Sequence, residues 1–274
     1  MRFTTRYRML SDINISQEQY VTNKPFPYYV QDSFLKNYDA QIVQQEIVNI
    51  PDCEWDRYDN PFEQKYTLRN KYTFPTHLNK LFEEFQSEEF VNRLSELCGY
   101  PLILDTTRNF WGVHKYKAND KLDIHVDAGL HPGNGLKKQL TLGLYLSSNW
   151  KKEYNCELEI WKGDNASRDD AKLYEKVDSI APLFNRLLLF TNNDYSWHGN
   201  PEPATCDENS SRIFITISYL SKQFRDENKR VKAFFIKRPS EPDDPEKDRL
   251  RRLRADPIKY KECYRSKPMN AEDK

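Results

Sequence analysis

His125 and Asp127 are separated by a single position in the stretch LDIHVD. On a β-strand, where successive side chains alternate between faces, both residues would leave the same face. His198, in the stretch SWHG, lies far enough downstream to come from another strand and complete a set of two imidazoles and one carboxylate. Such a set can hold ferrous iron on one face and leave three coordination positions open. We therefore take His125, Asp127 and His198 as candidate metal ligands.

Arg212 is a candidate for binding an organic acid near such a metal. It begins the apolar stretch RIFITISY, fourteen residues after His198. A guanidinium can bind a carboxylate through two parallel hydrogen bonds. A salt bridge at the edge of a strand is the alternative interpretation, and it stays open. We interpret the remaining histidines as hydrogen-bonded structural residues; they are His77, His114 and His131.

The composition excludes several classes of protein. The 274 residues include 42 basic and 42 acidic side chains, so no general electrostatic affinity for nucleic acid is expected. No apolar run approaches the roughly 18 residues of a membrane span, and we expect a cytoplasmic protein. The cysteines are odd in number and form no C-x-x-C pair, which favours free, mostly buried thiols. They are Cys53, Cys98, Cys156, Cys206 and Cys263.

Helical periodicity dominates the first hundred residues. Apolar residues recur at three- and four-residue spacing over 32–50, as in an amphipathic helix that covers one side of a sheet. Two shorter helices are predicted at 78–85 and 88–98. Ser87 is a suitable N-cap for the second of these, and Gly99 a suitable stop.

After Gly99 the period changes to that of strands. Short runs rich in β-branched and aromatic residues are separated by clusters of Gly, Pro, Asn and Asp, which predicts a β-sandwich or barrel. The seven runs are LILDTTRNFWGVHKYKA, LDIHVDA, KQLTLGLYLSS, CELEIWKG, KVDSIAP, RLLLFTN and SRIFITISYLS.

Three segments have weaker patterns. Residues 1–25 are interpreted as an extended lead-in, and 51–75 as a loop-rich stretch whose aromatics either line a groove or pack under a loop. Beyond Ser221 the chain becomes a charged tail with a short basic helix near 246–255. Its arginines could contact an acidic partner, but a solvated helix is the preferred interpretation.

From residues 109 to 221 the chain resembles the 2-oxoglutarate (2OG) and Fe(II)-dependent dioxygenases, in particular their prolyl 4-hydroxylase-like branch. The resemblance depends on an ordered series of motifs. They are HKY, LDIHVD, QLTLGLYLSSNW, ELEIW, IAPLFNRLLLF, SWHG and SRIFITISYL. Position by position, it implies that His125, Asp127 and His198 are the iron ligands and that Arg212 binds the distal carboxylate of 2OG.

The resemblance implies a mainly β fold with flanking helices (α+β). Its core would be a double-stranded β-helix, the cupin-like jelly roll, with N-terminal helices packed on one sheet. We expect residues 1–100 to form a helical support region of the same domain. Residues 101–221 would form the oxygenase core, and 222–274 a charged C-terminal extension, partly helical or flexible.

Four further residues match the cosubstrate pocket of the family. Tyr116 falls where relatives have a tyrosine beside the cosubstrate or substrate. Thr141 and Tyr145 fall on the strand that lines the 2OG pocket, and Leu158 matches an apolar wall. For the two tyrosines, a place in the core with a satisfied hydroxyl is an equal alternative.

Two departures from the family pattern concern loops. Many relatives have a Gly-Gly pair before the ELEIW strand, where this chain has Asn155 and Cys156, so a different turn is expected. The interval between His198 and Arg212 is longer than in the hypoxia-factor branch, which would lengthen a loop at the rim without moving the arginine off its strand.

The function implied by the resemblance is hydroxylation of a C–H bond, with a peptidyl proline as the first candidate substrate. Fe(II), 2OG and dioxygen would be required, with ascorbate as an optional reductant. One alternative is hydroxylation of a small molecule such as a free amino acid, sugar or nucleoside. A jelly roll that has lost its activity and serves as a binding module is the other. A protein, peptide or small-molecule partner is therefore expected, and neither nucleic acid nor membrane.

Overall fold

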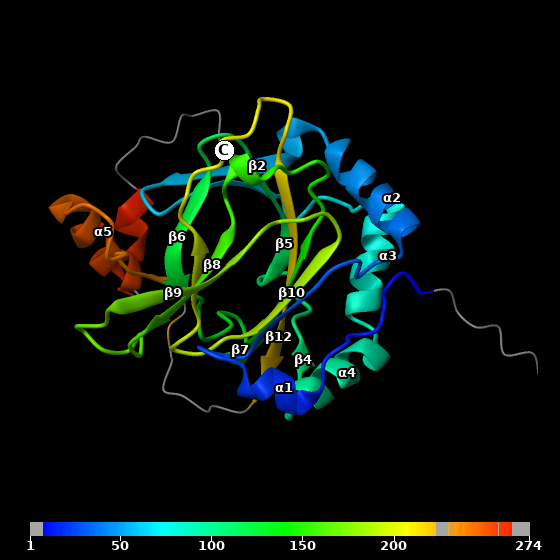
Figure 1. Cartoon of the computed structure of the whole chain (residues 1–274), viewed down its shortest axis with the longest axis horizontal. Helices are drawn as coiled ribbons and strands as arrows, with labels where there is room; N and C mark the ends of the chain where they lie inside the picture. The colour runs from blue at the N-terminus through cyan, green and yellow to red at the C-terminus, as the bar shows by residue number, and fades with distance from the viewer. Residues whose placement is uncertain (1–7, 223–229, 231, 257, 265–274) are drawn as a thin grey trace, which may run out of the picture.

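A computed structural model describes residues 8–222, 230, 232–256 and 258–264 of the chain. Among these residues, thirteen antiparallel strands form one sheet that curls around an interior, with helices outside it (Figure 1). Parts of the charged tail predicted beyond Ser221 lie outside the described residues. The curled antiparallel sheet with helices outside it confirms the predicted jelly roll with flanking helices.

One half of the curled sheet has the strand order β1-β10-β7-β12-β5, and the other has the order β6-β11-β8-β9. Strand β3 lies between the two halves and pairs with both β5 and β6, while β13 adds to β6, β2 to β3 and β4 to β12. The bounds are β1 (Tyr28–Gln31), β2 (Trp55–Asn60), β3 (Glu63–Leu68), β4 (Ile103–Leu104), β5 (Trp111–Tyr116), β6 (Lys121–Val126), β7 (Lys137–Tyr145), β8 (Leu158–Gly163), β9 (Leu173–Ile180), β10 (Arg186–Thr191), β11 (Trp197–Asn200), β12 (Arg212–Ser221) and β13 (Phe234–Phe235).

The alternation along β12 explains how one strand serves both the core and the interior. Ile213, Ile215 and Ile217 are buried in the main hydrophobic core beneath the helices. The intervening residues, from Arg212 to Ser218, line the cavity inside the sheet. Because side chains alternate along a strand, a single register of β12 fixes both faces.

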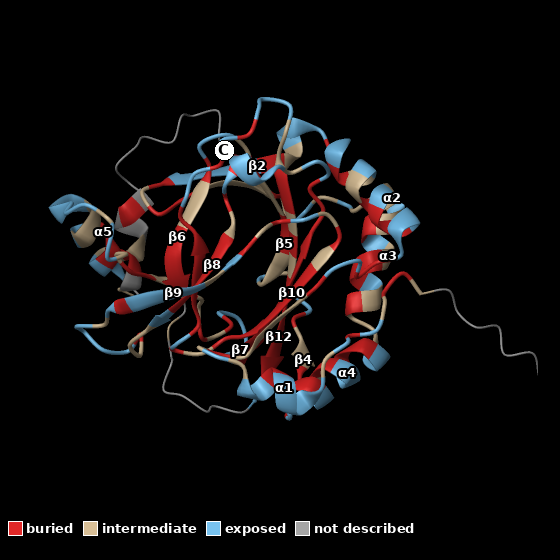
Figure 2. Ribbon diagram, viewed as in Figure 1, coloured by how far each residue is buried: buried red, intermediate tan, exposed pale blue. Residues whose placement is uncertain are grey.

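The N-terminal helices cover the outer face of the first half-sheet, with their buried sides turned toward it (Figure 2). As predicted, α4 begins after Ser87, whose side chain accepts a hydrogen bond from the amide of Phe90, and it ends at Gly99 with a left-handed φ of 79°. The helices are α1 (Gln17–Thr22), α2 (Asn37–Val48), α3 (Thr76–Phe85), α4 (Glu88–Cys98) and α5 (Pro245–Ala255), with 3₁₀ turns η1 (Asp52–Glu54), η2 (Lys152–Tyr154) and η3 (Lys259–Tyr264).

The C-terminal elements pack against the second half-sheet, on the opposite side of the molecule from α2 and α3 (Figure 1). Strand β13 pairs with β6, and α5 is joined to the same strand by ion pairs. Lys247 lies 2.6 Å from Asp123 of β6 and 2.8 Å from Glu241. The basic helix predicted near 246–255 therefore exists, and its charges are partly used to attach it to the strand that carries His125.

Three predictions of local structure were wrong. Residues 55–68, expected to be loop, form the hairpin β2–β3; its exposed side chains are charged, and β3 is stabilised by pairing with β5 and β6. The expected lead-in contains α1, which Ser16 and Gln19 cap reciprocally. Helix α2 begins at Asn37 rather than near residue 32, because β1 and a turn precede it.

All five cysteines are free, and four of them are buried, in agreement with the sequence. No helix in the described part of the chain is long and apolar enough to cross a membrane.

Candidate active site

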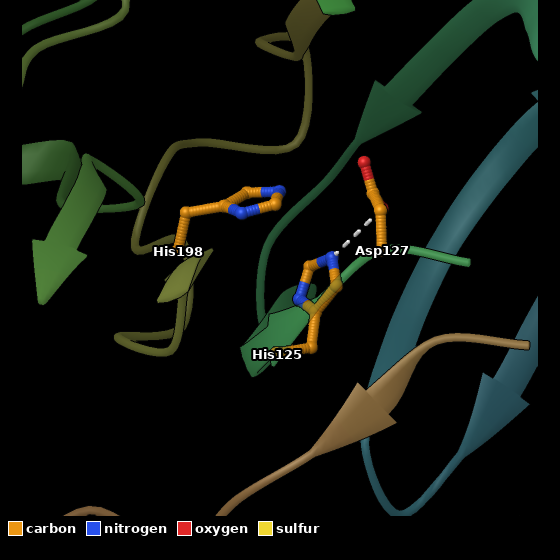
Figure 3. A group of neighbouring side chains, drawn as sticks. All are labelled: His125, Asp127 and His198. Carbon is orange, nitrogen blue, oxygen red and sulfur yellow. Dashed lines mark ion pairs between the residues drawn. The ribbon is translucent and has the colours of Figure 1, made fainter. Parts of the chain in front are cut away.

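Two adjacent strands and the residue after one of them bring His125, Asp127 and His198 together (Figure 3). His125 of β6 and His198 of β11 are direct partners in the antiparallel ladder, and their ring centroids are 4.5 Å apart. Asp127 follows β6 directly, and its Oδ1 lies 3.5 Å from Nε2 of His125. One potential ligand atom from each residue lies within 4.8 Å of the others. The side chains of His125 and Asp127, two positions apart in the sequence, thus lie close together, as expected from the alternation along a strand.

Both imidazoles are oriented by backbone carbonyl groups. Nδ1 of His125 donates to the carbonyl of Asp123 at 2.9 Å, and Nδ1 of His198 donates to the carbonyl of Ser196 at 2.8 Å. A carbonyl oxygen can only accept, so each Nδ1 carries a proton, and in the neutral tautomer this leaves the lone pair on Nε2. This arrangement is the usual support of metal-binding histidines.

Oδ2 of Asp127, the carboxylate oxygen that does not face His125, is held by two other side chains. Lys138 of β7 places its ammonium 2.7 Å from Oδ2. The amide of Asn192, in the orientation that satisfies both of its ends, donates to the same oxygen at 3.0 Å and accepts from Thr141. Oδ1 remains directed toward His125, so the carboxylate is fixed with one oxygen available to a metal.

A β-bulge explains how Lys138 reaches this position. The register of β7 and β12 shifts between Leu140 and Lys138, around Gln139. Gln139 bonds to Tyr100, outside the sheet, whereas Lys138 points into the interior. Such an extra residue re-aims its neighbours. Regular alternation would have put Lys138 on the same face as Leu140, so the sequence pattern could not identify it.

Arg212 is fully enclosed among aromatic rings at one end of the cavity. Its guanidinium carbon lies 4.7 Å from the ring centre of Tyr116, 4.9 Å from that of Tyr145 and 5.2 Å from that of Phe214. Nη2 donates to the hydroxyl of Tyr145 at 3.3 Å, whereas Nε and Nη1 are buried without a hydrogen-bond partner. Unsatisfied buried donors are costly, and a bound carboxylate would satisfy at least one of these two.

The four other pocket candidates lie around the same interior. Tyr116, Thr141 and Leu158 line the cavity. Tyr145 is not among its lining residues and contacts the guanidinium of Arg212 instead. Burial raises the pKa of both tyrosines, so both hydroxyls are protonated at neutral pH.

The electrostatics of the site favour the metal-binding forms of its ligands. Burial, together with the nearby His125, lowers the pKa of His198 to about 4, which keeps its imidazole neutral. Burial alone would raise the pKa of Asp127, but the ammonium of Lys138, the largest opposing influence, holds that pKa well below its usual value. A neutral imidazole and an ionised carboxylate are the forms that bind a metal.

The remaining histidines lie apart from this cluster. His77 contacts Glu46 at 3.0 Å, and the buried His131 contacts Asp105 at 3.2 Å. His114 lines the cavity, where its ring nitrogens lie within hydrogen-bond distance of Thr67 and Thr216. Their interpretation as structural residues agrees with these contacts.

The turn before β8 keeps a glycine-like backbone without glycine. Asn155 and Cys156 both have positive φ angles, of 52° and 60°. The thiol of Cys156 is buried and accepts a hydrogen bond from Asn200 at 3.1 Å. These residues therefore adopt the left-handed region that a Gly-Gly pair would favour, at some cost in strain.

The candidate ligands and Arg212 share one cavity of about 420 Å³, a size typical of small-molecule sites. The C-terminal segment contributes to its wall through Lys232, Ala233, Phe235 and Arg254. This contribution could not be predicted from the sequence, because the tail has few apolar residues and its position depends on ion pairs with β6.

The donor set suits ferrous iron and a dicarboxylate. Two imidazole Nε2 atoms and one carboxylate oxygen converge, as a facial iron site requires. In the same cavity, Arg212 has two buried donors without partners. These residues fit the metal and the organic acid that the sequence implied.

Comparison with protein families gives one match. Residues 111–220, from β5 to the end of β12, match the family described as the 2OG-Fe(II) oxygenase superfamily. A search of curated protein sequences gave no match.

Solved structures with the same fold include prolyl hydroxylases. A prolyl-4-hydroxylase from Pseudomonas putida is 13% identical with a TM-score of 0.55, and the alignment covers 76% of this chain and 97% of the other. A prolyl hydroxylase from Trichoplax adhaerens, in complex with a peptide fragment of the hypoxia-inducible factor oxygen degradation domain, is 19% identical with a TM-score of 0.55. That alignment covers 76% of this chain and 88% of the other.

Proposed function

We propose that the chain is a 2OG/Fe(II)-dependent oxygenase that hydroxylates a C–H bond of a peptidyl proline; its match to that superfamily over residues 111–220 and the fold it shares with prolyl 4-hydroxylases support this proposal. The observation that carries the reaction class is the meeting of His125, Asp127 and His198 in one cavity with the partnerless donors of Arg212. The family match supports the same class. The peptide substrate is supported by the peptide complex of the Trichoplax protein, whose fold this chain shares.

In this proposal His125, Asp127 and His198 are the iron ligands. When bound, the iron would supply the activation of dioxygen, with one oxygen atom passing to the substrate carbon and the other to succinate as 2OG loses CO₂. The carbonyl groups of Asp123 and Ser196 keep both imidazoles in the ligating tautomer. The protein also holds Asp127 ionised through Lys138, so no proton has to leave the site before the metal enters.

Arg212 would bind the distal carboxylate of 2OG, with Tyr145 as its neighbour. The aromatic rings around the guanidinium exclude water and hold its plane, which strengthens a bidentate contact. Tyr116, Thr141 and Leu158 would form the walls around the cosubstrate. The turnover would then need 2OG and dioxygen as cosubstrates, and ascorbate only to restore oxidised iron.

The test is an incubation of the purified protein with Fe(II), 2OG, air and a set of proline-containing peptides. We expect succinate and a mass gain of one oxygen on a peptide, both lost in His125→Ala. Succinate formation without any modified peptide would argue for the small-molecule alternative. Equal succinate from wild type and His125→Ala would contradict the iron site and favour a binding module.

A further inference from the structure

The cavity has an excess of positive charge that the proposed cofactors do not neutralise. The residues that line it in the described part of the chain include six cationic side chains and only two carboxylates, Glu63 and Asp127. The cations are Lys65, Arg108, Lys138, Arg212, Lys232 and Arg254. The positive charge of Fe(II) would cancel the negative charge of the 2OG dianion. The lining side chains therefore keep a formal excess of four positive charges. Since the whole chain is neutral, this excess is local and would attract an anionic ligand.

Four of these cations already have a partner or a proposed one, and Arg254 is one of them through its charge interaction with Glu63. Lys65 lies 3.1 Å from Glu63, and Lys138 lies 2.7 Å from Asp127. Arg212 is assigned above to the cosubstrate. A substrate carboxylate would therefore have to find a cation elsewhere along the wall.

Arg108 has the properties of such a cation. Within the described chain it has no carboxylate at ion-pair distance; Nη1 makes a long contact of 3.4 Å to the carbonyl of Tyr72, and Nε is buried without a partner. The guanidinium carbon lies 4.1 Å from the ring centre of Phe74 and 4.9 Å from that of Trp111. Stacked rings hold a guanidinium in place while its edge stays available for hydrogen bonds.

Hydrogen bonds to the side chain of Asp105 hold the loop that carries Arg108 in one conformation. Arg108 has a left-handed φ of 59°, which is unusual for a residue other than glycine. Asp105 holds this conformation by accepting hydrogen bonds from the amides of Thr107 at 2.8 Å and Phe110 at 2.9 Å. The buried ring of His131 contacts the same carboxylate at 3.2 Å. The position of Arg108 is therefore set before any ligand arrives, as in preorganised sites.

A second hollow adjoins the cavity at Arg108. It has a volume of about 300 Å³, and both Arg108 and Trp111 line it as well as the main cavity. Its lining includes Glu83, which accepts a hydrogen bond from Asn79 at 2.7 Å. A ligand long enough to contact both hollows would place its negative group near Arg108 rather than near Glu83.

We propose that the substrate is an acidic peptide, and that Arg108 binds the carboxylate of one of its side chains while a neighbouring residue lies at the metal site. This inference rests on the proposed function and adds the chemical class of the substrate. A nucleic acid is the less favoured anion, because the neutral chain offers no general basic surface for a phosphate backbone.

Binding can be measured without turnover, using protein loaded with Mn(II) and 2OG. The probes are peptides with a central proline and neutral flanks, in which one Glu, Gln or Lys is moved through the flanking positions. At the best position we expect the Glu peptide to bind about 10-fold or more tightly than its Gln counterpart, as a charge-assisted pair allows. Equal binding of the three peptides at every position, or no binding by any, would overturn the inference.

Variants assign the preference to one residue. Arg108→Gln should remove the difference between Glu and Gln peptides, and Arg108→Glu should reverse it in favour of Lys. The control is Arg93→Gln, which changes an exposed arginine of α4 and should retain the wild-type preference. A Glu preference that survives in Arg108→Gln would contradict the assignment, as would equally tight binding of N-acetylaspartate or a short single-stranded oligonucleotide. Absence of iron-dependent succinate, measured separately, would instead contradict the proposed function.

Discussion

Phe235 packs against the imidazole of His125, with ring centroids 5.2 Å apart and planes at 37°. The two residues are also direct partners in the ladder between β13 and β6. On its other side Phe235 stacks on Phe62 of the β2–β3 connection at 5.0 Å. A residue from the C-terminal extension is thus part of the wall that supports a candidate iron ligand.

Phe235→Ala should therefore destabilise the protein and loosen the metal site. Phe235 is 2% exposed, and the loss of so large a buried ring costs about 3–5 kcal/mol. Urea unfolding monitored by fluorescence would measure the loss, and Phe235→Leu, which retains most of the apolar volume, should lose clearly less. An unchanged midpoint in Phe235→Ala would show that the C-terminal segment does not pack here in solution.

His198→Ala should abolish the stimulation of succinate formation by Fe(II), with a loss of at least about 100-fold, because two ligands cannot retain the metal. His77→Ala is the matched control, since His77 lies outside the cluster and its ring contacts Glu46 at 3.0 Å. Succinate release can be followed by a coupled assay. Equal loss in both variants would point to a general effect on folding.

Arg212→Met should raise the KM for 2OG by about 10- to 150-fold, the range expected when a charge-assisted pair is lost. Arg212→Lys keeps the charge but not the two-pronged geometry, so an intermediate value is expected. Initial rates at varied 2OG concentrations would separate the three proteins. If Arg212→Met kept the wild-type KM, the buried donors would serve some other group.

Lys138→Met should weaken metal binding by about 10- to 100-fold, as the loss of a group that supports a metal ligand commonly does. The variant leaves Asp127 with Asn192 but without its cation. Titration with Mn(II), followed by its electron paramagnetic resonance signal, would measure the affinity directly. Lys162→Met, which changes an exposed residue of β8, should behave as wild type.

Glu241 should make the attachment of α5 dependent on pH. Burial raises its pKa, but Lys247 and Arg251 outweigh that effect and lower it to about 2. Because the folded-state value lies below the unfolded value of 4.5, the stabilisation is complete above pH 4.5 and is lost as pH falls toward 2. We expect Glu241→Gln to be less stable than wild type by about 1–2 kcal/mol at neutral pH, after solvent screening of this half-buried group.

Urea unfolding of both proteins between pH 7 and pH 3 would test this dependence. The free-energy difference should be constant at the upper end and shrink steadily below pH 4.5. A difference that did not change with pH would mean that Glu241 contributes no ion pair to the folded protein.

Local signals in the sequence predicted the elements whose stability is local. Ser87 and Gly99 delimit α4 by their own hydrogen bonds and conformation, and the alternation along RIFITISY predicted both the core and the cavity face of β12. The hairpin β2–β3 could not be found in this way, because its exposed residues are charged and its partners β5 and β6 come more than forty residues later.

Some residues of the candidate site could likewise be identified from local sequence signals, and others could not. The H-x-D spacing and the start of an apolar strand are visible in the sequence, so His125, Asp127 and Arg212 could be identified. Lys138 could not, since a bulge reverses its face. Phe235 could not either, because its contact with His125 depends on how a distant segment packs.

The direct pairing of His125 with His198 across β6 and β11 also bears on how metal enters and leaves the protein. Two of the three candidate ligands are fixed by the same backbone ladder that builds the sheet, so the apoprotein should need no rearrangement of strands to accept an ion. Chelation should consequently yield a folded protein with an unchanged far-ultraviolet circular dichroism spectrum. Activity should return on adding Fe(II) as fast as the ion diffuses in, without a refolding step.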